Sequence, residues 1–174
     1  MARNSTNPNK SIYWKAREEA GLTRAAASEA LQFISESRLE KIESGSTAIT
    51  PEDVLVMEKT YRKPGLCNHY CAEECPIGRE SVPHIEVKDL SKIVLEMLAT
   101  LNALNRQKDR LIEITEDGVI NDEELGDFLE IQDKLEKISI VASTMRLWID
   151  NAVANGNIDT LKINMFQSND NLQS

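Results

Sequence analysis

The sequence predicts an all-α protein, and two observations support this prediction. Short segments near the amino terminus begin at hydroxyl residues and end at glycine, as capped helices do. From Val87 onward, apolar residues recur at steps of three and four, which is the spacing of one helix face. We expect four parts in order: a small helical domain over residues 11–63, a cysteine-containing connector over 64–86, a long antiparallel helical hairpin over 87–156, and a mobile tail over 157–174.

A pair of short helices joined by a tight turn is predicted between Leu22 and Gly45. Thr23 and Ser35 can each cap a helix, because their hydroxyls can accept a hydrogen bond from a backbone amide two or three residues later. Gly45 can adopt the left-handed conformation that ends the second helix. The charged and polar residues would then face outward, because apolar residues three or four apart give each helix a buried side. Those apolar residues are Ala27, Leu31, Leu39 and Ile42.

These residues resemble the Cro-repressor/Xre family of helix-turn-helix regulators, over roughly residues 12–62. Gly21-Leu22-Thr23 begins the family pattern, and Thr50-Pro51-Glu52-Asp53 starts a further helix that closes the domain. The resemblance implies a lambda-repressor-like DNA-binding domain whose recognition helix enters the major groove. The turn before that helix is one residue longer than the family pattern. The recognition helix reads Ser35-Glu36-Ser37-Arg38-Leu39-Glu40-Lys41-Ile42-Glu43-Ser44-Gly45.

The resemblance assigns DNA contacts to the outer side of the recognition helix. We expect Arg38 and Lys41 to contact bases or phosphates, and Arg24 to contact a phosphate. Hydroxyl groups at the start of the helix would donate hydrogen bonds. Two glutamates on the same side can accept a hydrogen bond from the amino group of cytosine, but they also repel phosphate. The alternative is a helix-turn-helix scaffold retained for protein contacts. The candidate DNA-binding residues are Arg24, Ser35, Glu36, Ser37, Arg38, Glu40 and Lys41.

Charge is distributed unevenly along the chain. The formal net charge is −9, which taken alone argues against a nucleic-acid partner. Residues 1–63 hold ten Lys and Arg and nine Asp and Glu, so their balance is +1 and the remainder carries −10. An acidic region farther from the phosphates than a Debye length of roughly 8 Å is compatible with DNA binding. Because the predicted binding domain is nearly neutral, we expect weak and salt-sensitive affinity.

Three cysteines occupy the connector at four-residue intervals. Cys67, Cys71 and Cys75 would line one stripe of a helix, and His69 or His84 could complete a tetrahedral zinc site or help to hold an iron–sulfur cluster. The spacing matches no standard zinc finger or ferredoxin signature. Two alternatives remain, in which the thiols pack as small apolar groups or sense the redox state. The odd number of cysteines argues against a disulfide framework.

The segment after Val87 reads as two amphipathic arms separated by Asp117-Gly118. So short a break favours arms that fold back antiparallel, each on the order of 40 to 50 Å long at 1.5 Å per residue. The apolar seam of the first arm consists of Leu90, Val94, Met97, Leu101, Leu104 and Leu111. The seam of the second arm consists of Phe128, Ile131, Leu135, Ile138, Ala142, Met145, Ile149 and Ala152.

Both arms carry more apolar residues than one hairpin buries. Because exposed apolar area of that extent usually marks an interface, we expect two copies to pair as a four-helix bundle. In the alternative, the extra residues pack on the chain's own amino-terminal domain. These residues are Ile93, Leu98, Ile112, Leu125, Leu129, Ile140, Val141, Trp148 and Val153.

The sequence therefore predicts a transcriptional regulator that binds double-stranded DNA as a homodimer and reads two half-sites. One alternative is a protein-interaction adaptor whose acidic hairpin binds a basic partner, and another is a regulator that also responds to metal or redox state. We expect no enzymatic activity, because no glycine-rich phosphate loop and no Ser/His/Asp constellation is present. The polar first ten residues and the lack of an apolar run of roughly 18 residues predict a cytoplasmic protein that does not enter a membrane.

Overall fold

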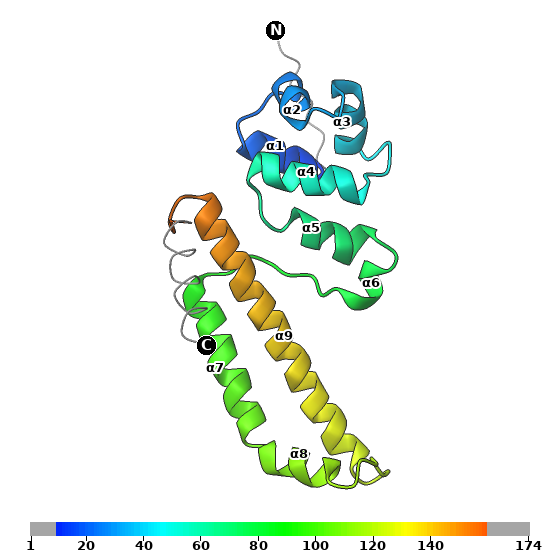
Figure 1. Cartoon of the computed structure of the whole chain (residues 1–174), viewed down its shortest axis with the longest axis vertical. Coiled ribbons are helices and arrows are strands. Elements are labelled where there is room, and N and C mark those ends of the chain that lie inside the picture. The colour runs from blue at the N-terminus through cyan, green and yellow to red at the C-terminus, as the bar shows by residue number, and fades with distance from the viewer. Residues whose placement is uncertain (1–9, 160–174) are drawn as a thin grey trace, which may run out of the picture. The chain divides into compact units, whose positions relative to one another are not determined.

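A computed structural model describes residues 10–159 (Figure 1), so the end of the predicted mobile tail lies outside the described residues. Every regular element in this part of the chain is helical, which confirms the predicted all-α class. The chain divides into two compact units, with a boundary between His84 and Ile85, and the second unit runs to Ala152. Among residues 10–159, no helix combines the length and the apolar content that crossing a bilayer requires.

Four helices surround the apolar core of the first unit. They are α1 (Ile12–Glu19), α2 (Arg24–Leu31), α3 (Glu36–Glu43) and α4 (Pro51–Tyr61). The helices pack as a small cluster, with α2 against α3 and both α1 and α2 against α4. The side chains at the centre of this core are almost completely inaccessible to solvent: Ala16, Ala27, Leu31, Leu39, Val54 and Met57.

The predicted helix starts are present. The Thr23 hydroxyl accepts a hydrogen bond from the Ala26 amide at 3.2 Å, and the Ser35 hydroxyl accepts one from the Arg38 amide at 3.3 Å. At the start of α4, Thr50 and Asp53 form a reciprocal capping box. Because each cap satisfies an amide that has no partner within its helix, these contacts fix where α2, α3 and α4 begin.

The turn between α2 and α3 is held on both sides. Gln32 has a left-handed backbone with φ 61°, and Ile34 is buried in the core. The Ser28 hydroxyl donates a hydrogen bond to the Ile34 carbonyl at 2.8 Å. Phe33, between these two fixed residues, points outward and is 86% exposed. The turn therefore sets the angle between the two helices with little freedom.

The cysteine-containing connector packs on the first unit. It consists of α5 (Leu66–His69), the π-helical turn η1 (Tyr70–Glu74) and α6 (Gly78–Ser81). Leu66 belongs to the same apolar core as α1–α4. A Cβ atom at Gly78 would lie 2.1 Å from the Cys71 carbonyl oxygen, so only glycine allows α6 to approach η1 this closely.

The second unit contains a helical hairpin. Its first arm is broken into α7 (Leu90–Asn105) and α8 (Lys108–Thr115), and its second arm is the single helix α9 (Leu125–Ala154). Figure 1 shows α7 running alongside α9, with α8 at the turn end. An ion pair links α8 to α9, in which Arg110 Nε donates to Asp127 Oδ2 at 2.6 Å. The arm breaks next to Lys108. This charged residue interrupts the apolar seam, so burial of apolar side chains does not stabilise a continuous helix at this point.

The predicted seam is only partly buried. In α9, Ile131 and Ala152 are buried, whereas Leu135 is 47% exposed and Ile149 is 38% exposed. In α7 the fully buried residue is Ile93, which the sequence places beside the seam. The hairpin thus encloses part of its apolar surface and leaves another part exposed. The exposed part, which we call the outward stripe, includes Leu98, Leu101 and Leu135.

Candidate nucleic-acid interface

The outer side of α3 carries polar residues over its whole length. Leu39 and Ile42 fix the inner side in the core, at 0% and 3% exposure. The exposed residues of the helix and its caps are Ser35, Glu36, Ser37, Glu40, Lys41 and Ser44. A rigid helix with one polar face left open in its own unit is a geometry that fits the major groove of DNA.

A buried ion pair holds the carboxyl end of α3 against α1. Glu43 is only 5% exposed, and its Oε1 accepts a hydrogen bond from Arg17 Nε at 2.5 Å while its Oε2 accepts one from Arg17 Nη2 at 3.2 Å. Arg17 Nη1 also donates to the Leu22 carbonyl at 2.6 Å. Burial disfavours the charged guanidinium, but the hydrogen bonds that it donates to Glu43 and Glu18 outweigh this effect and raise the pKa of Arg17. Two charges removed from water are thereby paired in the geometry that a bidentate contact requires.

Arg24 reaches the same carboxylate from the start of α2. Its Nε donates to Glu43 Oε2 at 2.8 Å, and its Nη1 lies 3.6 Å from Glu40 Oε1. The Arg24 side chain is 40% exposed, so part of the guanidinium still faces solvent. The predicted phosphate contact is therefore engaged with two carboxylates of α3, and a phosphate would have to compete with them.

Arg38 is joined to the start of α4. Its Nη2 donates to Asp53 Oδ2 at 2.5 Å, and 38% of the Arg38 side chain remains exposed. Asp53 also belongs to the α4 capping box, in which its Oδ2 accepts a hydrogen bond from the Thr50 amide at 3.2 Å. Among the predicted basic contacts, Lys41 differs from both arginines, because it is exposed and no ion pair is found for it within residues 10–159.

The structure gathers the predicted residues around α3, but it also shows three residues whose contacts at this site were not predicted from the sequence. These are Arg17, Glu43 and Asp53, which hold the helix and its arginines in place. One signal for Glu43 was available, since it lies four residues after Leu39 and so shares the buried helix face. No local pattern indicates that its partner lies 26 residues away in α1.

The three cysteines are all free and half-buried. Burial, followed by the nearby Glu58 carboxylate, raises the pKa of Cys67 to about 12. Among residues 10–159, no group of three or more His, Cys, Asp or Glu side chains is arranged to hold a metal ion. The proposed set of Cys67, Cys71, Cys75 and His69 stays a prediction from spacing.

Both histidines of the chain instead belong to a polar cluster that ties the connector to α1. Tyr13 in α1 donates a hydrogen bond to Glu74 Oε1 at 2.5 Å. His69 packs edge-on against the Tyr13 ring, with 6.4 Å between ring centroids, and against His84 at 6.1 Å. Burial and the bond to Glu74 raise the pKa of Tyr13 far above its usual range. The cluster fixes the connector on the face of the domain built by α1.

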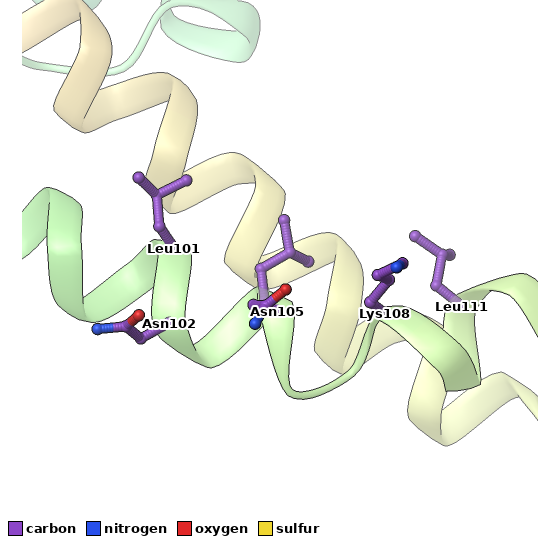
Figure 2. Close-up of a pocket in the computed structure, with 6 residues that line it drawn as sticks. Leu101, Asn102, Asn105, Lys108 and Leu111 are labelled. Atoms are coloured by element: carbon purple, nitrogen blue, oxygen red, sulfur yellow. The ribbon is translucent and has the colours of Figure 1, made fainter.

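A hollow of about 480 Å³ lies in the hairpin at the break between α7 and α8. Figure 2 shows Leu101 and Leu111 projecting to the same side of the ribbon on either side of the break, with Lys108 between them. Asn102, Leu104 and Asn105 complete its lining. All lining residues come from one arm, and they carry no constellation for catalysis.

A comparison with protein families gives one match. A family model described as a helix-turn-helix domain matches residues 15–65, which run from α1 to the start of the connector. No curated protein and no solved structure matches the chain. The match confirms the predicted helix-turn-helix domain and suggests a DNA-binding regulator. The narrower Cro-repressor/Xre assignment stays a prediction.

Proposed function

We propose that this protein is a sequence-specific DNA-binding transcriptional regulator that reads the major groove with the outer side of α3. One observation carries the proposal: α3 is fixed from behind by the Arg17–Glu43 ion pair, and its outer residues remain exposed. A recognition helix must be held rigidly, because a small displacement would misplace every base contact. Helix-turn-helix domains are typically non-enzymatic, so we assign the chain a binding role.

The charges of this surface favour selective binding over strong binding. Asp53 holds Arg38, and two glutamates hold Arg24, so neither arginine is an unopposed positive charge. Nonspecific affinity depends mainly on neutralising phosphates, and this surface has few free cations with which to do so. We therefore assign Lys41 to a phosphate contact. We assign the discrimination between DNA sequences to hydrogen bonds with bases.

The outward stripe of the hairpin supports a homodimer. Leu98 is 52% exposed, Leu101 is 44% exposed, and the hollow at the α7–α8 break continues the same apolar surface. A second hairpin can cover this surface and form a four-helix bundle. A two-fold dimer would present two α3 helices to half-sites about one helical turn, ~34 Å, apart.

Selection of bound sequences from a random DNA pool at low salt tests the proposal. We expect one enriched motif with two-fold symmetry. Lys41→Ala should weaken binding to it and lower the slope of log affinity against log salt by about one. Lys59→Ala is the matched control, because Lys59 is an exposed lysine on α4 that lies near Cys67. An unchanged affinity and salt slope in Lys41→Ala would reject the phosphate contact, and the absence of any enriched motif would reject α3 as the reading helix.

A second candidate function is a protein-interaction adaptor that does not bind DNA. Two features favour it: Glu36 and Glu40 are exposed on α3, and residues 109–136 contain eleven Asp and Glu against two Lys and Arg. Such a region can attract a basic partner. Failure of the selection, together with salt-sensitive binding of a lysine-rich peptide to the full chain, would favour the adaptor.

A further inference from the structure

The ion pair between Arg38 and Asp53 joins the recognition helix to a second, independently fixed part of the domain. Asp53 cannot swing away with Arg38, because it is part of the α4 capping box. The Thr50 amide donates to Asp53 Oδ2 at 3.2 Å, and the Asp53 amide donates to the Thr50 hydroxyl at 3.3 Å. The Asp53 side chain is 13% exposed. The carboxylate is therefore an anchor whose position is set by α4.

The guanidinium of Arg38 has further N–H donors besides the one that binds Asp53. A guanidinium carries five N–H donors in one plane, and the bond to Asp53 runs from Nη2. With 38% of the side chain exposed, part of the guanidinium remains accessible from outside the domain. Because the pair limits the rotamers of Arg38, the side chain loses less conformational freedom when it binds a ligand than an unrestrained arginine would.

The neighbouring carboxylate decides which DNA group fits this guanidinium. A phosphate carries a full negative charge and would be repelled by Asp53 at close range. The major-groove edge of guanine presents two neutral acceptors, O6 and N7, whose spacing matches two donors of one arginine. A guanidinium held beside a carboxylate therefore favours the neutral, planar acceptor pair over the charged one.

We infer that Asp53 is a positioning residue that aims Arg38 at a guanine in the major groove, so that a guanine becomes part of the sequence this protein selects. The inference rests on the proposed DNA-binding function and adds a specific base and a specific supporting residue to it. Asp53 itself touches no DNA in this arrangement. It acts through Arg38, by fixing the plane of the guanidinium and by screening it from phosphates.

The test uses the enriched DNA with its guanines replaced one at a time by 7-deazaguanine, which keeps O6 and base pairing but lacks the N7 acceptor. For the wild-type chain, we expect one position at which this replacement weakens binding by about tenfold. Arg38→Ala should bind both DNAs equally at that position. Asp53→Asn keeps an oxygen acceptor for the α4 cap but removes the charge, and it should reduce the discrimination to twofold or less while steepening the salt dependence.

Thr50→Ala is the matched control, because it removes the hydroxyl that accepts from the Asp53 amide but keeps the Thr50 amide that donates to the Asp53 carboxylate, so Asp53 stays in place next to Arg38. It should retain the discrimination even if it lowers thermal stability. Full discrimination by Asp53→Asn would overturn the inference, and so would the absence of any position sensitive to 7-deazaguanine. Failure of the wild-type chain to bind any DNA would instead reject the proposed function, so the two failures are distinguishable.

Discussion

The two units of this chain bury their apolar side chains to different degrees. In the first unit, one core encloses residues from α1 to α5, and buried charges such as Glu43 have partners. In the hairpin, the buried set is narrow, and large apolar residues such as Leu95 and Leu129 are more than half exposed. The first unit is thus complete as a single folded body. The hairpin leaves large apolar side chains exposed, which is the surface that the proposed dimer requires.

This difference is tested most strongly by breaking the buried ion pair behind α3. Glu43→Ala would leave the Arg17 guanidinium buried without its main partner, which costs about 3–5 kcal/mol of folding stability. The chain has one tryptophan in each unit, Trp14 in α1 and Trp148 in α9, so urea unfolding of single-tryptophan variants can follow each unit separately. We expect the Trp14 transition to shift strongly and the Trp148 transition to stay in place.

A double replacement provides the control for this prediction. Arg17→Met combined with Glu43→Leu removes both buried charges and replaces them with apolar groups of similar size, so most of the lost stability should return. Equal shifts of both tryptophan transitions in Glu43→Ala would show that the units unfold as one cooperative body. That result would contradict the separation between them.

Local and non-local features were predictable from the sequence to different extents. Helix starts such as Thr23 and Ser35 were correct because a cap depends on residues within one turn of the helix. The Arg17–Glu43 pair was not predicted, because its partners meet only after α1 and α3 have packed. The candidate DNA-binding residues were found through the family pattern. The pattern also contains Glu43 and Asp53, but it does not indicate that these carboxylates hold the two arginines.

The hairpin shows another limit of prediction from the spacing of apolar residues. Steps of three and four assign Ile131 and Leu135 to the same seam, yet the first is 1% exposed and the second is 47% exposed. Ile131 and Ile149 also differ, at 1% and 38% exposure, although their separation along the helix places them on the same side of α9. The spacing therefore predicts that an apolar face exists, but it does not predict which part of that face is buried and which part is left exposed.

The outward stripe of the hairpin can be tested by placing charges on it. Leu98→Glu and Leu135→Glu should each weaken self-association by about a hundredfold, because a charge in an apolar interface loses its hydration without gaining a partner. Sedimentation at micromolar concentration should show a dimer for the wild type and a monomer for each variant. The helix content should change little, since both side chains are about half exposed within one chain.

Lys137→Glu is the control for the hairpin variants. Lys137 is a surface residue whose side chain is 59% exposed and pairs with Asp133 in its own helix, so reversing its charge should leave self-association unchanged. A stable monomer of the wild type, or a loss of helix content in Leu98→Glu, would contradict the dimer. In the second case, the outward stripe would be packed within a single chain.

The smallest expected effect concerns Cys67, where the connector meets the enclosed core. Its pKa is raised from 9.0 to about 12, first by burial and then by Glu58. In the folded state the thiol therefore stays protonated at pH 9, whereas about half of it is thiolate when the chain is unfolded. Alkylation by iodoacetamide at pH 9 should be at least ~100-fold slower in the native chain than in urea, as peptide mass mapping can measure.

The raised pKa of Cys67 also determines how the folding stability of the chain changes with pH. Since the folded pKa lies above the unfolded one, the unfolded chain releases this proton first, and the contribution of Cys67 is complete below about pH 9 and is lost as the pH rises toward 12. Cys67→Ala should flatten this part of the stability profile, as followed by Trp14 fluorescence. Native alkylation of Cys67 as fast as in urea would show that the connector does not stay packed on the core. The enclosed part of the first unit would then end at Tyr61, the last residue of α4.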